Sequence, residues 1–268
     1  SENTELYLIT GTNDGSVRFT EVNDQTGSPS GIEKWSYIPR ELLPNLAILA
    51  TNSAADEHPY GVDTTITLLK DDSGDGTIHS TTLASDGNRL IAYFGRRRGG
   101  KHYYAVDNTK PNDPELLWKI GKSDSDFNEL GLTFSTPIRT VLQWDTNPPK
   151  PVIMFAGGYD KDKDDDSNAL DGFTLYPSST TVSNSAYVDD EGNAIFIVDA
   201  LTGSLVWKAV YGKSGTDTDT IHYSPYLRDS IPSDLTVVGI NPATVDDTVA
   251  DTIYVGDTGG AILRADLI

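Results

Sequence analysis

An acidic stretch between two glycines carries the densest set of metal-binding side chains in this sequence. It reads GGYDKDKDDDSNALDG from Gly157 to Gly172. Alternate residues of a short loop that wraps an ion point inward, and Ca²⁺ prefers carboxylate and carbonyl oxygens. Positions 1, 3, 5, 7, 9 and 12 of such a loop are occupied by Asp160, Asp162, Asp164, Asp166 (through its carbonyl), Asn168 and Asp171. The sequence therefore predicts a calcium site here as the first choice.

The same stretch departs from an EF-hand loop at two positions. Asp165 stands where a glycine allows the sharp turn, and Asp171 is shorter than the glutamate used at position 12. The alternative interpretation is a charged excursion that keeps an exposed loop soluble. Both interpretations stay open at the level of the sequence.

The overall composition excludes several classes of function. Cysteine is absent from the 268 residues, which excludes disulfides, Cys-ligated zinc and thiol catalysis. A net charge of -20 repels phosphate backbones, so we expect no nucleic-acid partner. No apolar run approaches the roughly 20 residues that span a bilayer, so we expect no membrane insertion. No nucleophile elbow, Walker loop or dinucleotide fingerprint occurs, so no motif indicates these classes of enzyme.

The elements that would position the acidic stretch are mostly strands. Four segments share one pattern, in which an apolar strand, a glycine turn and a second apolar strand follow one another. They are LITGTNDGSVRFTEVND, AYFGRRRGGKHYYAVDN, YVDDEGNAIFIVDALTGSLVWK and IYVGDTGGAILRADL. Such repetition predicts an all-β fold, a β-propeller formed as a single domain over 1–268. Helical spacing of leucines predicts one short helix near 39–52.

The spacing of the glycine turns is wider than in ordinary propellers. It runs from Gly15 to Gly100, Gly192 and Gly260, which exceeds the ~40–50 residues of common blades. We therefore expect blades that carry long insertions or some blades that are degenerate, and the fold prediction includes a partial or compact propeller. Because Ser1 follows no initiator methionine, we interpret the chain as a processed product or a fragment of a larger secreted protein.

A series of segments connects the sequence with a known family. They are GTNDGSVRF (11–19), WSYIPRELLPNL (35–46), HPYGVD (58–63), FGRRRGGKHYYAVD (94–107), LLWKIG (116–121), FSTPIR (134–139), GGYD (157–160), GNAIFIVDALTGSLVW (192–207), IPSDLTVV (231–238) and DTIYVGDTGGAILRADL (251–267). In this order they resemble the C-terminal propeller domain of the PilY/PilC family, the type IV pilus tip-associated adhesins. The resemblance covers nearly the whole chain and rests on the series rather than on any single segment.

The resemblance implies a non-enzymatic pilus biogenesis factor and adhesin, located outside the cell at the pilus tip and associated with the outer membrane. It implies partners among the pilins or minor pilins and a ligand on a host or abiotic surface. It also implies calcium as a cofactor, held by a loop of the last blade that modulates pilus assembly and surface attachment. The pattern of that loop is Asp-x-Asp/Asn-x-Asp-x-x-x-Asp, directly before the IYVGD strand.

This chain keeps only part of the family's calcium loop. Asp247, the Val249 carbonyl and Asp251 match the pattern, whereas Ala243 and Val245 replace its first two side-chain ligands. Ca²⁺ is held by six to eight oxygens. The stretch from Asp160 to Asp171 therefore remains the first choice for calcium.

Arg96, Arg97 and Arg98 form the one basic cluster in an acidic sequence. They could dock a carboxylate-rich partner such as a pilin or a glycan through bidentate contacts. The alternative is that they pair with neighbouring carboxylates around a glycine turn. Alternation along a strand also means that the three side chains need not face the same way.

Two other functions remain open. VDALTGSLVW resembles the repeated units of quinone-dependent dehydrogenase propellers, which would predict a bound quinone with calcium. A secreted carbohydrate-binding propeller would also explain the strands and the plentiful tyrosines.

Overall fold

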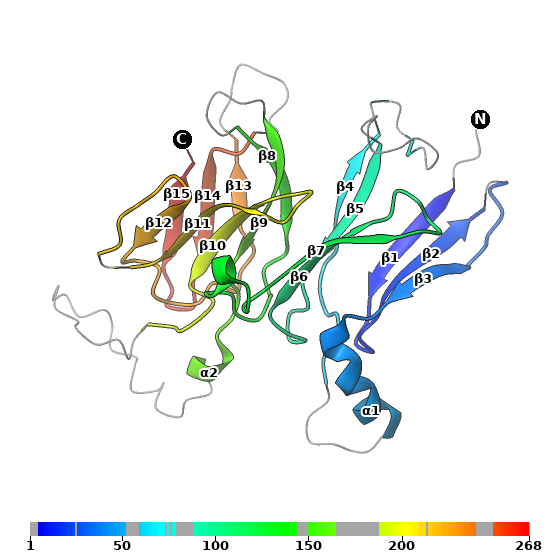
Figure 1. The fold of residues 1–268 in the computed structure, drawn as a ribbon, viewed down its shortest axis with the longest axis horizontal. Coiled ribbons are helices and arrows are strands. Elements are labelled where there is room, and N and C mark those ends of the chain that lie inside the picture. Colours follow the sequence, from blue (N-terminus) through cyan, green and yellow to red (C-terminus); the bar gives the residue numbers. More distant parts are fainter. Residues whose placement is uncertain are drawn as a thin grey trace.

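The computed structural model describes residues 5–24, 26–51, 59–72, 74, 77–78, 88–143, 149–164, 188–212, 214–239 and 249–267. They form four sheets that follow one another along the chain (Figure 1). The first sheet is ordered β1 (Leu6–Gly11), β2 (Val17–Asn23), β3 (Glu33–Tyr37), and the second β4 (Thr67–Asp71), β5 (Arg89–Phe94), β6 (His102–Asp107), β7 (Glu115–Gly121). The third is ordered β12 (Ile221–Ser224), β11 (Leu205–Tyr211), β10 (Ala194–Asp199), β9 (Lys150–Ala156), β8 (Ile138–Leu142), and the fourth β13 (Thr236–Val238), β14 (Thr252–Gly256), β15 (Ile262–Asp266).

Each sheet is a meander of consecutive strands, as in a propeller blade. All neighbouring strands are antiparallel except β11 and β12, which run parallel. The first and last sheets lie at opposite sides of the molecule, so the four blades form an open arc (Figure 1). The prediction of a partial β-propeller with one short helix is confirmed.

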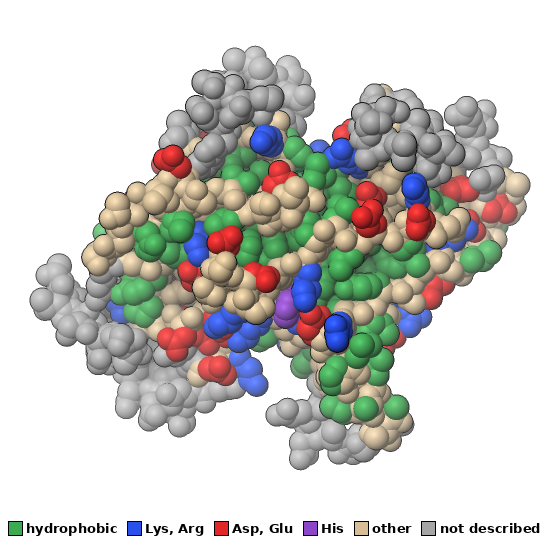
Figure 2. All heavy atoms as spheres, in the orientation of Figure 1, with side chains coloured by type: hydrophobic (Ala, Val, Ile, Leu, Met, Phe, Trp, Pro, Cys, Tyr) green, Lys and Arg blue, Asp and Glu red, His purple; other side chains and the backbone are tan. Residues whose placement is uncertain are grey.

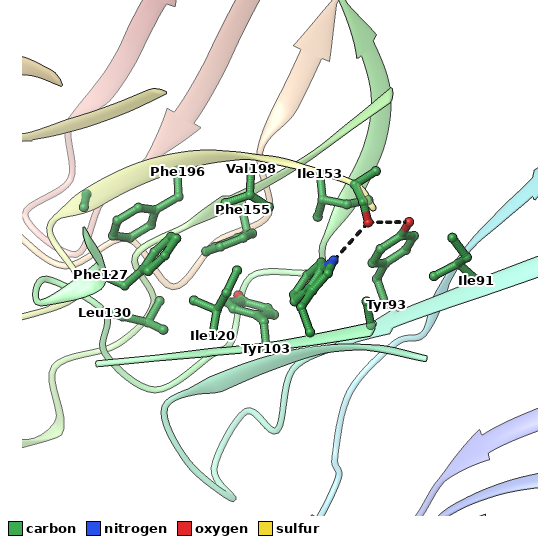
Figure 3. Close-up of a cluster of buried hydrophobic side chains, with 14 of the residues drawn as sticks. Ile91, Tyr93, Tyr103, Ile120, Phe127, Leu130, Ile153, Phe155, Phe196 and Val198 are labelled. Carbon is green, nitrogen blue, oxygen red and sulfur yellow. Dashed lines mark hydrogen bonds between the residues drawn. The ribbon is translucent and has the colours of Figure 1, made fainter. Parts of the chain in front are cut away.

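Each junction between neighbouring blades encloses a cluster of buried apolar side chains. Phe94 and Tyr104 of the second blade pack with Val17 of the first, and Met154 and Ile197 of the third pack with residues of the fourth. The largest cluster lies between the second and third blades and is shown in Figure 3; its aromatic members are Tyr93, Tyr103, Trp118, Phe127, Phe155 and Phe196. Burial between blades, rather than within one blade, therefore holds the arc together.

One carbonyl links the second and third blades through two donors. The Tyr93 hydroxyl and the Trp118 indole N–H both donate to the Ala200 carbonyl, each at 3.0 Å (Figure 3). Gly203, in the turn after β10, lies against the Trp118 ring, where an added Cβ would come within 2.8 Å. Its φ of 70° also favours glycine. Trp118 thus packs in the cluster between the second and third blades.

The helical segment near 39–52 consists of a 3₁₀ turn, η1 (Arg40–Leu42), followed by α1 (Leu43–Thr51). Pro44 lies in the first turn of α1, where its missing N–H breaks no helical hydrogen bond. α1 projects away from the sheets (Figure 1). Two further short segments are a 3₁₀ turn, η3 (Ser125–Phe127), and α2 (Lys161–Asp164). Within the described residues, no helix combines the length and the hydropathy needed to cross a membrane.

The shared glycine turns correspond to one hairpin in each blade. They join β1 to β2, β5 to β6, β9 to β10 and β14 to β15. Segments that connect successive blades bind these turns: Val62 donates to the Thr12 carbonyl, Leu132 to that of Tyr159 and Ile231 to that of Gly192. The acidic stretch is an expansion of the third of these hairpin turns.

Candidate metal centre

The first half of the predicted calcium loop begins at the end of β9. Gly157 donates to the Ala194 carbonyl, which extends the pairing of β9 with β10, and Gly158 donates to the Ile231 carbonyl. Gly158 has a φ of 98°, and an added Cβ would lie 2.1 Å from the Leu132 carbonyl oxygen. Only glycine fits this crossing of three segments. The chain then turns at Asp160 into α2.

Asp160 is a buried carboxylate that joins the two ends of the insertion. Only 2% of its surface is exposed. One of its oxygens accepts the Asp162 N–H at 3.1 Å, and the other accepts the Asp190 N–H at 3.0 Å. Because Asp190 lies at the returning end of the insertion, this carboxylate closes the base of the loop.

A third acidic side chain completes a group around Asp160. Asp162 comes from the first turn of α2, and Glu191 comes from the segment before β10. One carboxylate oxygen from each of Asp160, Asp162 and Glu191 lies within 4.8 Å of the others, and no second group of three acidic or histidine ligands forms among the described residues. The structure therefore contains an acidic group that could hold a metal ion.

Two lysines already bind Glu191, which is buried like Asp160. Glu191 has 4% of its side chain exposed, and its two carboxylate oxygens contact the ammonium groups of Lys101 and Lys122. Figure 2 shows lysine or arginine and acidic side chains together in the region of α2. The lysines come from the second blade, so this contact also joins blades two and three. Two positive charges offset much of the charge of the three carboxylates.

A fourth carboxylate, Asp189, lies close enough to interact with Asp160. Burial raises the pKa of Asp189 to about 6, and the negative charges of Asp160 and Asp229 add to the increase. A hydrogen bond from the Ser230 N–H to its Oδ2 opposes this increase. Desolvation thus exceeds the effect of the hydrogen bond. A cation bound nearby would lower the pKa of Asp189 again.

The donor set of the acidic group suits a hard cation such as Ca²⁺ or Mg²⁺. Three carboxylates supply up to six oxygens, the lower limit for Ca²⁺. Both oxygens of Asp160 and of Glu191 already have partners, however. An ion would have to displace the lysines from Glu191 or recruit further oxygens from the insertion. Cation binding at this group would therefore require either a rearrangement of these lysines or ligands from outside the group.

Only part of the predicted first-choice site lies within the described residues. Asp160 and Asp162 lie in the acidic group described above, and Asp164 ends α2. Residues 161–164 form a helical turn rather than an extended loop. The remaining predicted ligands lie outside the described residues; these are Asp166, Asn168 and Asp171.

The loop that matches the family pattern is likewise described only at its end. Asp247 lies outside the described residues. Val249 forms a parallel bridge with Val141, and Asp251 directly precedes β14. The Asp251 N–H donates to the Val238 carbonyl at 3.1 Å, and its own carbonyl accepts from Leu267. The backbone of Asp251 is therefore used by the fourth sheet.

The three consecutive arginines have three different surroundings. Arg96 is buried, and its Nη2 lies 2.6 Å from Nδ1 of His102. Burial, followed by the charge of Arg96, lowers the pKa of His102, so a neutral imidazole accepts this hydrogen bond. Arg97 lies over the Phe134 ring, and Arg98 lies over Tyr60. The arginines do not form one continuous basic patch.

Glu191 was missed by the sequence analysis. Its position follows from strand register, because continuing the pairing of Ile195 with Ala156 places Glu191 opposite Asp160. The signal in the sequence was the match between VIMFAGG and GNAIFIV as two strands of one hairpin with a long insertion. Recognising this hairpin would have brought the acidic run at 189–191 to the metal group.

Comparisons with known proteins find relatives that are named as type IV pilus biogenesis factors. No family model matches the chain. The type IV pilus biogenesis factor PilY1 of Pseudomonas aeruginosa is 27% identical over 267 residues, which cover 97% of this chain and 17% of that protein. The chain is related to PilY1. A PilY1 homolog of Xylella fastidiosa is 30% identical over 131 residues, which cover 49% of this chain and 9% of the homolog.

The crystal structure of the P. aeruginosa PilY1 C-terminal domain shares the fold. It superposes with a TM-score of 0.56 at 22% identity, covering 98% of this chain and 38% of that domain. The predicted resemblance to the PilY/PilC propeller is therefore confirmed. The chain spans about a sixth of the length of the full PilY1 relative, so the similarity concerns one part of PilY1.

Proposed function

We propose that this chain is a propeller module of a type IV pilus biogenesis factor. The observation that carries the proposal is the similarity to PilY1 along 97% of the chain, together with the shared fold of the C-terminal domain. The module would act outside the cell, associated with the outer membrane and the pilus tip. Its partners would be pilins or minor pilins.

Disruption of the gene in the source bacterium tests this function. Pilin sheared from the cell surface should fall strongly while total cellular pilin stays constant, and the intact gene supplied in trans should restore it. Unchanged surface pilin in the disrupted strain would contradict the proposal. Attachment of the same strains to host cells and to plastic, at equal piliation, would test the additional role as an adhesin.

The proposed action is binding rather than catalysis. The segment VDALTGSLVW, which is similar to units of quinone-dependent dehydrogenases, has a structural use in this chain. Oδ1 of Asp199 accepts the N–H groups of Leu201 and Thr202, each at 2.9 Å, and so stabilises the turn before β11. The role of Asp199 in this turn accounts for the motif, so the motif does not require a bound quinone. Absorbance of a quinone in the purified protein would overturn the non-enzymatic assignment.

We further propose Ca²⁺ as the ion that the group of Asp160, Asp162 and Glu191 takes, with ligands from the acidic insertion. Supporting this are the buried carboxylate of Asp160 and the proximity of the three acidic side chains. Binding would exchange the lysine contacts of Glu191 for contacts to the ion. Calcium would then modulate the junction between blades two and three, where those lysines originate.

A further inference from the structure

A small polar pocket lies where the first and second blades meet, and none of its lining residues belongs to the acidic group. Its volume is about 200 Å³. The lining includes Asn13 of the first hairpin turn, Asp63, Thr64 and Thr65 of the connecting segment, and Arg97 of the second hairpin turn. Its side chains are thus mostly hydrogen-bonding groups. The size and polarity suit one sugar unit rather than an apolar ligand.

Arg97 is the residue whose conformation is unusual. Its φ is 48°, the only positive φ of a non-glycine residue in the described part of the chain. Its N–H donates to the Thr133 carbonyl at 3.2 Å, which fixes the backbone in this conformation. A strained residue at a pocket is a reason to look for a function of its side chain.

The guanidinium of Arg97 is oriented by an aromatic ring instead of a carboxylate. Its Cζ lies 5.1 Å from the centroid of the Phe134 ring. Within the described ranges, no acidic side chain forms an ion pair with Arg97, and its Nε is buried without a hydrogen-bond partner. In a protein with a net charge of -20, this guanidinium keeps a positive charge that no carboxylate of the described residues pairs with, and a guanidinium is the side chain that suits a carboxylate ligand.

Asp63, the one carboxylate that lines the pocket, forms an ion pair with Arg98, which does not line it. Oδ2 of Asp63 lies 3.9 Å from Nη1 of Arg98, whose guanidinium also lies 5.0 Å from the centroid of the Tyr60 ring. The charges of Asp63 and Arg98 offset each other, so Arg97 gives the pocket a local positive charge. The hydroxyls of Thr64 and Thr65 and the amide of Asn13 provide both donors and acceptors.

We propose that this pocket binds an acidic sugar unit, with its carboxylate on Arg97 and its hydroxyl groups on Asn13, Asp63, Thr64 and Thr65. A guanidinium binds a carboxylate through two parallel hydrogen bonds. Hydroxyls of a sugar require a mixture of donors and acceptors, which the remaining lining supplies. This proposal adds a second function to the proposed role in pilus assembly, namely the binding of a negatively charged saccharide.

Titration of the ¹⁵N-labelled protein with glucuronate, followed by NMR, tests the proposal. Amide shifts should cluster at residues 62–65 and 97, and binding should be at least tenfold weaker for glucose and for acetate. If glucose binds as tightly as glucuronate, the proposed role of the ligand carboxylate is wrong. If acetate binds as tightly as glucuronate, the proposed role of the sugar hydroxyls is wrong. Absence of shifts at these residues would overturn the site.

Variants of Arg97 separate binding from folding. Arg97→Gly removes the guanidinium and adopts the positive φ without strain. Arg97→Ala also removes the guanidinium but keeps a Cβ at this positive φ, as the native arginine does. Both should lose at least tenfold in affinity for glucuronate, while the melting temperature of Arg97→Gly shows that the protein is folded. Arg264 lies 5.8 Å from the Tyr254 ring centroid and lines no part of the pocket, so Arg264→Ala is the matched control. Glucuronate binding that survives in a folded Arg97→Gly variant would refute the proposal.

Discussion

Asp160 and Glu191 face each other across the ends of β9 and β10, although the acidic insertion separates them in sequence. One carboxylate accepts two backbone N–H groups, and the other contacts two lysines of the preceding blade. The pair therefore joins the base of the insertion to the junction between blades two and three. A cation at this place would change a contact between blades.

Calcium is expected to stabilise the folded protein. A ligand that binds only the native state adds about 2.7 kcal/mol at 100 times its Kd. Thermal unfolding should shift upward with millimolar calcium, and the double substitution Asp162→Ala with Asp164→Ala should remove the shift. Asp113→Ala, at another exposed position, should leave the shift intact. Calorimetry without a binding event at millimolar calcium would rule the site out.

The stability of the protein should depend on the protonation of Asp189. Its pKa is raised from 3.8 to about 6 in the folded protein, so the folded state is favoured below pH 4 and loses this contribution as the pH rises through about 6. Asp189→Asn should therefore stabilise the calcium-free protein at pH 7.5 by about 1 kcal/mol, after allowance for solvent screening. The gain should vanish below pH 4. Urea unfolding at both pH values measures it, and an equal gain at both would contradict the explanation.

Removing one lysine from Glu191 should destabilise the calcium-free protein. Lys101→Met leaves a nearly buried carboxylate with one ionic partner fewer, which costs about 1–3 kcal/mol. The exposed pair of Lys110 and Asp113, at 4.0 Å, provides the control, and Lys110→Met should change the free energy of unfolding by less than about 0.5 kcal/mol. If both substitutions change the free energy of unfolding equally, the contact between Lys101 and Glu191 contributes no more to stability than an exposed ion pair.

The packing of Gly203 against Trp118 predicts a large effect of a single methyl group. Gly203→Ala combines a contact of 2.8 Å with a φ of 70°, and should cost about 1–3 kcal/mol. Gly31 has a similar φ of 76° with nothing near its Cβ position, so Gly31→Ala isolates the cost of the backbone alone. Urea unfolding should show the larger loss for Gly203→Ala, and equal losses would contradict the role of the Trp118 contact.

Most of the fold could be predicted from the segments that repeat along the sequence. The glycine turns and apolar runs indicated the blades because hairpins and strands are local patterns, and the helix near 39–52 was visible from the spacing of its leucines. The pairing of strands in the third blade was harder to predict from the sequence. Its hairpin is interrupted by the acidic insertion, so GGYD and DDEGN looked like separate segments rather than two sides of one turn.

The candidate sites were predictable only in part. Asp160 and Asp162 followed from local spacing, whereas Glu191 required the register of β9 with β10, and the lysines at Glu191 required the packing of two blades. The unusual φ of Arg97 had no counterpart in the sequence, because RRRGG is compatible with many turns. Long-range contacts set these features. Of them, only the position of Glu191 had a signal in the sequence, in the match of the two strands of its hairpin.

The central claim is that this propeller module itself supports assembly of the type IV pilus. An in-frame deletion of the coding region for residues 1–268 in the source bacterium tests it most directly, with total cellular pilin followed by immunoblot. We predict at least a tenfold fall in pilin sheared from the cell surface, with total pilin unchanged, and recovery when the same coding region is restored. Normal surface pilin in the strain that lacks these residues would contradict the account.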